Sequence, residues 1–501
     1  MMAHNLTQVL PSVQTFIERI HGFFIDGRST AASTGACFDV FNPATGTVLA
    51  RVADCGSQDV EDAVDCARRT FQSRTWSGLR PADRERILLR LADLLETHAE
   101  ELAQIETLNQ GKSIRLARGI EVAGSVEYTR YMAGWSTKLA GETLDVSIAA
   151  QPGARYTAFT RREPVGVVAA IVPWNFPLMI AVWKLIPALA AGCTVVLKPA
   201  AETPLTALRL AELAIEAGVP PGVFNVVTGK DALVGQLLSG STKINKITFT
   251  GSTAVGKKVG QAAVESMARF ALELGGKNPM IVLDDVNVDK AVQGAIAGAF
   301  FNQGQVCAAV SRLYVHRKQL ESVVDGIASV IHSMSFGSGM DADADINPLV
   351  SERHQHSVFN RVDMARDEGA QLIVGGQIPD LPGYFMEPTL FVAEPSMDSR
   401  VVKEEIFGPV LTVVPYDNID QAVQMANDSV YGLAASLWTE NLASVMNLIP
   451  QIQAGTVWVN THLPLDPSLP FGGMKQSGMG REFGAHAVES FTELKSICIS
   501  H

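Results

Sequence analysis

The feature that most constrains the fold of this chain is an alternation of short apolar runs with helical segments, which begins at Val165. Short apolar runs bounded by turn residues are typical of buried strands. Candidate strands lie at residues 165–172, 194–197, 223–227, 246–250 and 270–274, and candidate helices at residues 178–191, 204–217, 232–238 and 254–265. Strands that alternate with helices at this spacing predict a parallel, doubly wound sheet.

A second series of apolar runs predicts a second sheet, with candidate strands at residues 280–283, 312–315, 410–416 and 456–459. Ahead of both series, residues 24–42 are typical of short strands around a turn at Asp26-Gly27, and residues 58–71 and 81–109 are typical of helices. A chain of 501 residues has room for about three domains. We therefore expect an α/β protein in which two such sheets form separate cores.

Composition and charge exclude several classes of protein. Hydrophobic residues make up 47% of the chain and charged residues 18%, so the chain is too apolar to be disordered. The net charge of −12 argues against nonspecific binding to nucleic acid or to an anionic membrane surface. Residues 164–183 carry no charge, but prolines at 173 and 177 interrupt them. We expect a strand, a loop and a helix there rather than a membrane span.

The cysteines and histidines indicate a compartment but no metal. The six cysteines form no CxxC pair and are too sparse for a disulfide scaffold, which favours a reducing compartment. Residues 1–10 are polar and lack the apolar core of a signal peptide, so we expect a cytoplasmic protein. There is no HExxH motif, and His354 and His356 are spaced to point to different sides of most elements. We expect a surface pair there and no metal site.

The sharpest phosphate-binding signal lies at residues 249–258, between a candidate strand and a candidate helix. The stretch from Gly251 to Lys257 matches GxxxxGK, but Lys258 stands where a P-loop needs Ser or Thr for magnesium. Ser252 can cap the helix, whose free amides favour an anion, so a phosphate site and an ordinary capped helix both stay open. The segment Gly111-Lys112-Ser113 lacks the upstream glycine of a P-loop, and GxGxxG is absent from the chain.

Three polar residues in apolar surroundings are candidates for catalysis. Cys307 ends an apolar run whose amide side chains would need partners if buried, although a free cysteine is more often a small hydrophobe. Glu273 ends an apolar strand, where burial raises a carboxyl pKa toward that of a general base, and an ion pair with Lys277 is the alternative. Asn175 lies in a turn bracketed by prolines, where it either donates to an oxyanion or only shapes the turn.

Seven segments in this order resemble the aldehyde dehydrogenase superfamily, and the resemblance runs from about Phe24 to the C-terminus. They are PWNFP at 173–177, KP at 198–199, FTGS at 249–252, LELGGKNP at 272–279, GQVC at 304–307, EIFGP at 405–409 and PFGGMKQSG at 470–478. The resemblance implies an NAD(P)-binding domain (1–140 and 161–275), a catalytic domain (276–477) and a small β oligomerisation arm (141–160 and 478–501). It also implies a homo-oligomer, either a dimer or a tetramer.

The resemblance implies roles for the candidate residues. Cys307 would be the nucleophile, and the Asn175 side chain with the backbone N–H of Cys307 would hold the oxyanion. Hydride transfer to the nicotinamide would leave a thioester on Cys307, and Glu273 would activate water to release the acid. Lys184 is implied as a further catalytic residue.

The implied cofactor is NAD, with NADP as an alternative. Members that prefer NAD often carry a glutamate three residues after the lysine that corresponds to Lys198, and here that position is Ala201, with Glu202 next to it. Loss of the carboxylate removes repulsion toward a 2′-phosphate, so we expect weak discrimination. Lys198 would lie near the adenine ribose, Ser252 near the pyrophosphate, and Glu405 and Phe407 at the nicotinamide. The remaining implied cofactor contacts are Trp174, Gly229, Gly235, Phe249, Gly251 and Leu274.

The implied substrate is a small aldehyde. The positions implied to line its tunnel are aromatic or apolar, which suits an arylalkyl chain; they are Phe176, Met179, Trp183, Phe301 and Leu465. Residues 12–27, 106–113, 130–148 and 455–462 are most similar to bacterial phenylacetaldehyde dehydrogenases. A betaine-aldehyde or broad aliphatic enzyme, a P-loop nucleotide hydrolase and a non-catalytic structural relative are the alternatives.

Overall fold

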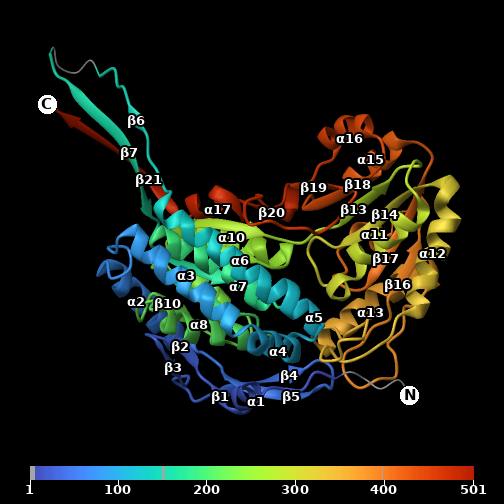
Figure 1. Ribbon diagram of the computed structural model, residues 1–501, viewed down its shortest axis with the longest axis horizontal. Coiled ribbons are helices and arrows are strands. Elements are labelled where there is room, and N and C mark those ends of the chain that lie inside the picture. Colours follow the sequence, from blue (N-terminus) through green and yellow to red (C-terminus); the bar gives the residue numbers. More distant parts are fainter. Residues whose placement is uncertain (1–5, 149–152, 398) are drawn as a thin grey trace.

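Two open sheets form the cores of the molecule, as Figure 1 shows for this computed structural model. The structure describes residues 6–148, 153–397 and 399–501. The first sheet has the strand order β20-β12-β11-β8-β9-β10-β2-β3, and the second has the order β15-β16-β17-β14-β13-β18-β19. Most neighbouring strands in both sheets are parallel, which confirms the predicted doubly wound architecture.

The first sheet contains every strand predicted for it, with small shifts at the ends. Its central strands are β8 (Val167–Ile171), β9 (Thr194–Lys198), β10 (Phe224–Val226), β11 (Lys246–Thr250) and β12 (Arg269–Glu273). The helices between them are α7 (Pro177–Ala191), α8 (Leu205–Ala217), α9 (Leu233–Gly240) and α10 (Thr253–Ser266). Residues 164–183 thus run through a strand, a loop and a helix, as expected. Among the residues that the structure describes, no helix is long and apolar enough to cross a membrane.

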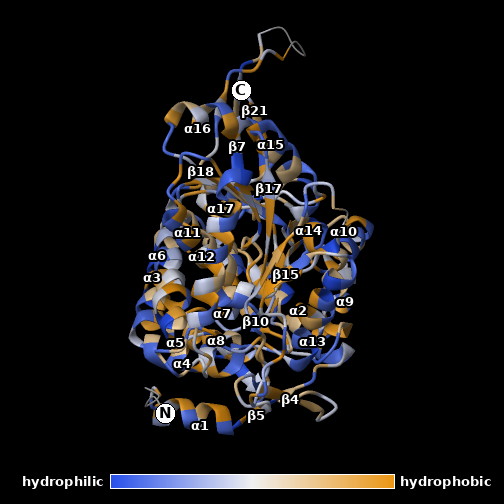
Figure 2. Ribbon diagram, turned by 90° about the vertical axis from the view of Figure 1, so that its right-hand side faces the viewer, coloured by the Kyte–Doolittle hydropathy of each residue, from blue (hydrophilic) through white to orange (hydrophobic). Residues whose placement is uncertain are grey.

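Burial on both faces explains why these strands read as continuous apolar runs. Along β8, Val168 and Ala170 pack into one core cluster, while Val167, Ala169 and Ile171 pack into another on the opposite face. Helices α7 and α8 cover the first face, and α2 (Ser57–Gln72), α9 and α10 cover the second. Figure 2 shows the apolar strands inside and the polar helix faces outside. Both faces exclude water, so most strand residues are apolar.

The second sheet contains three strands that the sequence did not predict. The predicted ones are β13 (Asn278–Val282), β14 (Val310–His316), β17 (Val410–Tyr416) and β19 (Thr456–Val459); the added ones are β15 (Gln371–Val374), β16 (Thr389–Val392) and β18 (Ala434–Trp438). Strand β18 begins with two alanines and a serine, which have low strand propensity. It is extended because it pairs with β13 and β19 and every residue in it is buried.

The N-terminal region contributes two strands to the first sheet, a small separate sheet and several helices. Strands β2 (Phe23–Ile25) and β3 (Arg28–Thr30) form the predicted hairpin at Asp26-Gly27, and β2 pairs with β10. A small separate sheet has the order β1 (Ile20–His21), β5 (Thr47–Ala53), β4 (Cys37–Asn42). Helices α3 (Pro81–Thr97) and α4 (Ala99–Gln110) follow, and then α5 (Ile114–Leu116), the π-helical turn η1 (Ala117–Val122) and α6 (Ala123–Ala133).

A three-stranded sheet projects from the body of the molecule (Figure 1). Strand β7 (Tyr156–Pro164) pairs antiparallel with β6 (Thr143–Leu144) and, along its whole length, with β21 (Thr492–Ser500). The predicted pairing of a hairpin with the C-terminal strand is therefore confirmed, although hairpin residues 149–152 lie outside the described residues. Strand β20 (Gly478–Met479), which the expected boundary assigned to the arm, instead extends the first sheet beside β12.

Candidate active site

The site forms where the carboxyl ends of the first sheet face the second sheet. Asn175 follows β8, Lys198 ends β9, Gly251 follows β11 and Glu273 ends β12. These strands are parallel, so their carboxyl ends share one edge, which is where ligands bind in open α/β sheets.

A cleft at this edge has a cavity volume of about 260 Å³. Both sheets contribute to its walls. The predicted site residues that line it are Trp174, Asn175, Gly251, Ser252, Leu274, Cys307, Glu405 and Phe407. The structure thus brings residues more than 200 positions apart in the chain into one cavity.

Cys307 lies in a tightly wound loop at the inner end of this cleft. Ahead of it, Asn302 and Gln303 adopt left-handed φ angles of 48° and 54°, which side chains seldom adopt. The Cys307 carbonyl accepts a hydrogen bond from the Asn278 side chain at 2.8 Å. Gly276 passes so close that a Cβ there would lie 2.6 Å from the same carbonyl oxygen. The loop is therefore held from two sides by the segment that follows β12.

Electrostatics keep the Cys307 thiol protonated in this state of the protein. Burial raises its pKa most, the carboxyls of Glu405 and Glu273 add to the effect, and together they raise the pKa to about 12. Ionisation of the thiol at neutral pH therefore requires a positive charge or a proton acceptor in the cleft.

Asn175 joins its own loop to the loop of Cys307. Its side-chain Nδ2 donates to the carbonyl of Gln305 at 3.0 Å, and its carbonyl accepts from Asn302 Nδ2 at 3.1 Å and from Lys112 Nζ at 2.9 Å. An amide nitrogen carries two protons, so one N–H remains for a ligand in the cleft. Asn302 and Gln305 are buried, and each amide makes at least one hydrogen bond, as expected for amides that are shielded from water.

Glu273 is buried, and neither of its carboxylate oxygens has a hydrogen-bond partner among the described residues. Burial and the charge of Glu482 raise its pKa well above the usual value. The alternative role, an ion pair with Lys277, is not formed in the described part of the chain. Lys184 is fully buried on α7 and donates to Thr248 Oγ1 at 3.1 Å and to Glu482 Oε1 at 2.5 Å.

The phosphate-loop segment is a short turn with a capped helix. Only Gly251 and Ser252 separate β11 from α10, so no wide P-loop exists. The Ser252 side chain accepts the Val255 N–H, which confirms the predicted cap. Lys257 lies outside the cleft and donates to the Gln476 side chain at 2.9 Å. The P-loop alternative is therefore wrong. Gly256 serves packing instead, because a Cβ there would lie 2.4 Å from the Leu274 side chain.

Lys198 stands next to two of the predicted glycines. Its Nζ donates to the Pro199 carbonyl at 3.1 Å, and burial lowers its pKa. Gly235 on α9 faces the Lys198 stem, and Gly229 has no room for a Cβ beside Val234. Phe249 is buried in β11, where a Cβ on Gly251 would collide with its ring.

Ala201 is half-buried against the first core, and the neighbouring carboxylate is already engaged. Glu202 Oε1 accepts from Arg353 Nη2 at 2.6 Å, which joins the loop after β9 to α13 (Glu352–Asp367). The glutamate next to Ala201 is therefore paired with a cation of the second half of the molecule.

An aromatic cluster lies beside Glu405 in the second half of the cleft. Phe407 has a left-handed φ of 61°, and its ring meets that of Trp174 at 5.3 Å. The His354 ring lies 4.8 Å from Trp174, and its Nε2 donates to the Phe407 carbonyl at 2.8 Å. The prediction of a surface histidine pair is wrong for His354, because α13 turns it toward the cleft and only His356 is exposed.

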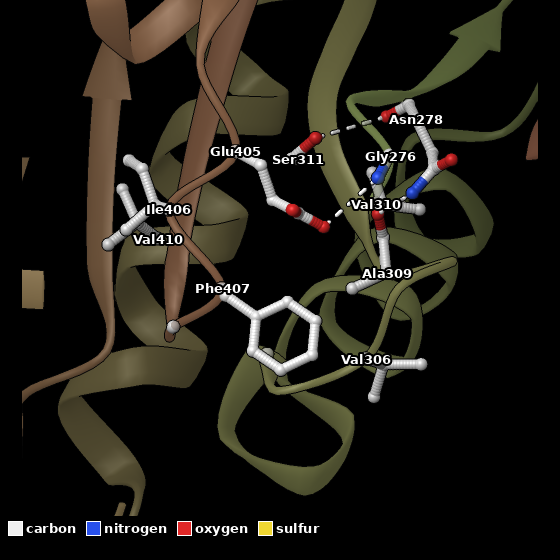
Figure 3. Close-up of a pocket in the computed structure, with 12 residues that line it drawn as sticks. Gly276, Asn278, Val306, Ala309, Val310, Ser311, Glu405, Ile406, Phe407 and Val410 are labelled. Carbon is white, nitrogen blue, oxygen red and sulfur yellow. Dashed lines mark hydrogen bonds between the residues drawn. The ribbon is translucent and has the colours of Figure 1, made fainter. Parts of the chain in front are cut away.

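Figure 3 shows a smaller hollow next to the cleft, with the Glu405 carboxylate pointing to the backbone of Gly276 and the Phe407 ring beside it. Glu405 Oε1 accepts the Gly276 N–H at 3.0 Å. Burial raises the pKa of Glu405 to about 7, so the carboxyl is partly ionised near neutral pH.

Comparison with known proteins identifies the family. The model of the aldehyde dehydrogenase family matches residues 30–497. The chain belongs to the aldehyde dehydrogenase family. A phenylacetaldehyde dehydrogenase of Pseudomonas fluorescens is 50% identical over 482 residues, which cover 96% of each chain.

Solved structures of family members have the same fold. An NAD⁺ complex of an aldehyde dehydrogenase from Bacillus cereus is 42% identical, covers 99% of both chains and has a TM-score of 0.95. An indole-3-acetaldehyde dehydrogenase complexed with NAD⁺ is also 42% identical, covers 96% of this chain and 97% of its own, and has a TM-score of 0.92. The predicted fold class is therefore confirmed.

The five positions predicted to contact the substrate differ in how deeply they are buried. The rings of Phe176 and Phe301 stack at 6.2 Å, and Trp183 meets the Phe483 ring at 4.8 Å. Met179 is buried at the start of α7, whereas Leu465 is 40% exposed in the loop after β19. Four of the five positions are thus close to the protein interior, and Leu465 lies at the surface.

Sequence reasoning missed a group of buried charges behind Asn175. Lys112 is fully buried and contacts the carboxylates of Glu106 and Glu121, although its Gly-Lys-Ser segment read only as an incomplete P-loop. The available signal was Lys112 itself, a charged residue that comes directly after the buried end of α4. Among the residues that the structure describes, no group of three His, Cys, Asp or Glu is placed to hold a metal ion.

Proposed function

We propose that this chain oxidises an aldehyde to its carboxylic acid with NAD(P)⁺, through a covalent intermediate on Cys307. The observation that carries the proposal is the meeting of Cys307 and the free N–H of Asn175 in the cleft, with the unpaired carboxyl of Glu273 directly before the lining residue Leu274 and near enough to raise the pKa of Cys307. A nucleophile, an oxyanion donor and a buried base are the groups that acyl transfer needs.

In the first step, the Cys307 thiolate attacks the aldehyde carbon and forms a C–S bond. The carbonyl oxygen becomes an oxyanion, which accepts hydrogen bonds from Asn175 Nδ2 and from the backbone N–H of Cys307. Collapse of this tetrahedral adduct leaves a thioester on Cys307 and releases the former aldehyde hydrogen as hydride, for which NAD(P)⁺, when bound, would be the acceptor. The thiol proton leaves to the solvent, directly or by way of Glu273, which releases it again before the second step, and the raised pKa of the thiol makes this ionisation a demanding part of the reaction.

In the second step, Glu273 takes a proton from water as the water attacks the thioester. The carboxylic acid leaves, and Cys307 recovers its proton from Glu273. Burial gives Glu273 a raised pKa, which makes it a stronger base than an exposed carboxylate. The charge of Glu482 adds to this increase, whereas the charge of Lys184, which donates to Glu482, lowers the pKa of Glu273 and partly offsets it.

The residues of the cleft fit a dinucleotide. Ser252 would place the N-terminus of α10 at the pyrophosphate, Lys198 would donate to the adenine ribose, and Glu405 would accept from the nicotinamide ribose, with Phe407 and Trp174 against the ring. The remaining cofactor positions would let the dinucleotide and the protein backbone approach each other closely; they are Gly229, Gly235, Phe249, Gly251 and Leu274. When bound, NAD(P)⁺ supplies the hydride acceptor. Similarity to two NAD⁺ complexes supports NAD as the main cofactor, and Ala201 supports weak exclusion of NADP.

For the substrate we propose phenylacetaldehyde or a similar arylalkyl aldehyde. Identity of 50% to a phenylacetaldehyde dehydrogenase supports it, as do the stacked rings of Phe176 and Phe301 and the ring of Trp183. Aromatic side chains at these positions favour an aryl group over a charged one. A betaine aldehyde or an aliphatic aldehyde would be recognised without stacking.

We also propose that the β6-β7-β21 sheet assembles a homo-oligomer in which the domains keep the predicted boundaries, except that Gly478–Met479 belong to the first sheet. The sheet leaves strand edges open and carries exposed apolar side chains, among them Leu494 and Ile499. Open edges and exposed apolar side chains are typical of a surface that pairs with another chain.

Absorbance of the reduced nicotinamide tests the proposal. The protein is mixed with phenylacetaldehyde, betaine aldehyde or hexanal, with NAD⁺ and NADP⁺ in separate reactions, and Cys307→Ala is the control. We expect turnover that is fastest with phenylacetaldehyde and lost in the variant. Turnover that survives in Cys307→Ala would refute the covalent mechanism, and a faster reaction with either other aldehyde would refute the substrate.

A further inference from the structure

The group of buried charges behind Asn175 has no place in the mechanism above. Lys112 follows Gly111, which ends α4 in a left-handed conformation, and its side chain is fully buried. Its Nζ forms an ion pair with Glu121 on the π-helical turn η1 and lies 3.2 Å from Glu106 Oε1. Burial raises the pKa of Glu106 to about 8, so that carboxyl is largely protonated at pH 7 and the Lys112–Glu121 pair is neutral overall.

The Lys112 ammonium also contacts the loop of Asn175 directly. It donates to the Asn175 carbonyl at 2.9 Å and lies 4.4 Å from the centre of the Phe176 ring. Asn302 Nδ2 donates to the same carbonyl at 3.1 Å. A carbonyl oxygen has two lone pairs, so both are used, and the Asn175 peptide cannot rotate without the loss of one bond.

The other oxygen of Glu121 holds the helix that follows the loop. Its Oε1 accepts the Met179 N–H at 2.9 Å, in the first turn of α7. The N-cap residue of that helix, Phe176, offers no capping side chain, so Glu121 supplies the cap from another element. One ion pair therefore fixes the backbone on both sides of Phe176, at Asn175 through Lys112 and at Met179 through Glu121.

We propose that Lys112, paired with Glu121, is the positioning residue that aims the Asn175 side-chain amide at the reacting carbonyl. Lys112 does not line the cleft and touches neither the reacting atoms nor the cofactor positions. Its action runs through the Asn175 backbone, whose orientation sets the direction of the free Nδ2 proton. This inference rests on the proposed role of Asn175 at the oxyanion.

The energetics set the size of the expected effect. Removal of one oxyanion donor typically lowers kcat by about 10²- to 10³-fold. A misplacement of about 1 Å of a catalytic group costs up to about 10²-fold. We expect Lys112→Met to lower kcat by about 10- to 100-fold and to leave the KM for NAD⁺ within about twofold, because the cofactor positions are untouched.

A double-mutant cycle with Asn175→Ala tests the coupling. If Lys112 acts through the Asn175 side chain, Lys112→Met lowers kcat in the wild-type background but has little further effect in Asn175→Ala. Lys246 is a matched control: it is also a buried lysine, its Nζ donates to the Ser490 carbonyl at 2.5 Å, and it lies over the Phe491 ring at 4.1 Å. It lies at the opposite end of β11 from the cleft, so Lys246→Met and Asn175→Ala should have multiplicative effects.

A second variant separates positioning from folding. Lys112→Met leaves Glu121 buried without its partner, which lowers stability. In Lys112→Met/Glu121→Gln the unpaired charge is gone, and the glutamine oxygen can still accept the Met179 N–H. We expect the thermal midpoint to recover while kcat stays low, because the donor to the Asn175 carbonyl is still missing. Recovery of both quantities would mean that the pair is only structural.

Alkylation by iodoacetamide measures the reactivity of the Cys307 thiol in a reaction that forms no oxyanion. The positioning role predicts that Lys112→Met alkylates within about threefold of the wild-type rate, because the thiolate displaces iodide at a methylene carbon and no oxyanion forms. A larger change would mean that the whole loop has moved and would refute a role through Asn175. A multiplicative Lys112–Asn175 cycle would refute it as well. If Asn175→Ala itself retains wild-type kcat, the oxyanion assignment fails instead.

Discussion

The contact between Glu405 and the backbone after β12 gives the sharpest steric prediction. Gly275 is buried, and its φ lies outside the left-handed region, so alanine can adopt the same backbone conformation. A Cβ there would lie 2.0 Å from Glu405 Oε2 and 2.7 Å from its Cδ. In Gly275→Ala the carboxylate must therefore move by about 1 Å or more to regain van der Waals contact.

The displacement breaks the hydrogen bond from the Gly276 N–H to Glu405 Oε1 that Figure 3 shows. An unpaired buried N–H costs about 1–3 kcal/mol of unfolding free energy, and overpacking costs a similar amount. If Glu405 binds the nicotinamide ribose, loss of that contact costs about 1–2 kcal/mol of binding, which weakens the Kd for NAD⁺ by about 5- to 30-fold.

Calorimetric titration with NAD⁺ and thermal unfolding without cofactor measure both effects. Gly260→Ala is the matched control, because a Cβ on that residue of α10 meets Leu272 at an ordinary 3.6 Å, and alanine stabilises a helix by about 1 kcal/mol relative to glycine. In Gly275→Ala/Glu405→Ala the collision is absent but the Gly276 N–H is still unpaired, so we expect stability to recover only in part and affinity not to recover. A Gly275→Ala protein with unchanged stability would refute the steric reasoning, and one with lower stability but unchanged Kd would refute the cofactor role of Glu405.

Three further predictions concern the chemistry and the cofactor. Glu273→Gln should release about one equivalent of reduced cofactor per site in a burst and then turn over about 10²- to 10⁴-fold more slowly, because the thioester persists; stopped-flow absorbance without a burst would contradict this. The pKa of Cys307 is raised to about 12, so its thiolate fraction and its iodoacetamide alkylation rate should rise about tenfold per pH unit between pH 7 and 10; a flat profile by peptide mass spectrometry would contradict it. Ala201→Glu should lower kcat/KM for NADP⁺ at least about tenfold by charge repulsion, with Ala201→Gln as the neutral control, and an equal loss with NAD⁺ would disprove the repulsion.

Strands that are buried on both faces could be predicted from the sequence alone. β11 and β17 have the predicted bounds, because burial on two faces leaves a continuous apolar run that local composition reveals. The helix start at Ser252 was also predictable, since a cap acts within three residues. Local patterns of this kind, with the ordered segments that resemble the family, were enough to single out Cys307, Glu273 and Asn175.

Contacts between distant segments could not be predicted. β18 is a strand because it pairs with β13 and β19, and His354 lines the cleft because α13 faces Trp174. Lys112 lies 63 positions from Asn175, and nothing in the sequence around either residue records their hydrogen bond. Each element must bury its apolar side chains away from water, and this requirement leaves an apolar pattern in its own sequence. The sequence therefore determined the elements and the sheets. Pairing of buried charges depends on which elements meet, so only the tertiary structure decided how the site is held.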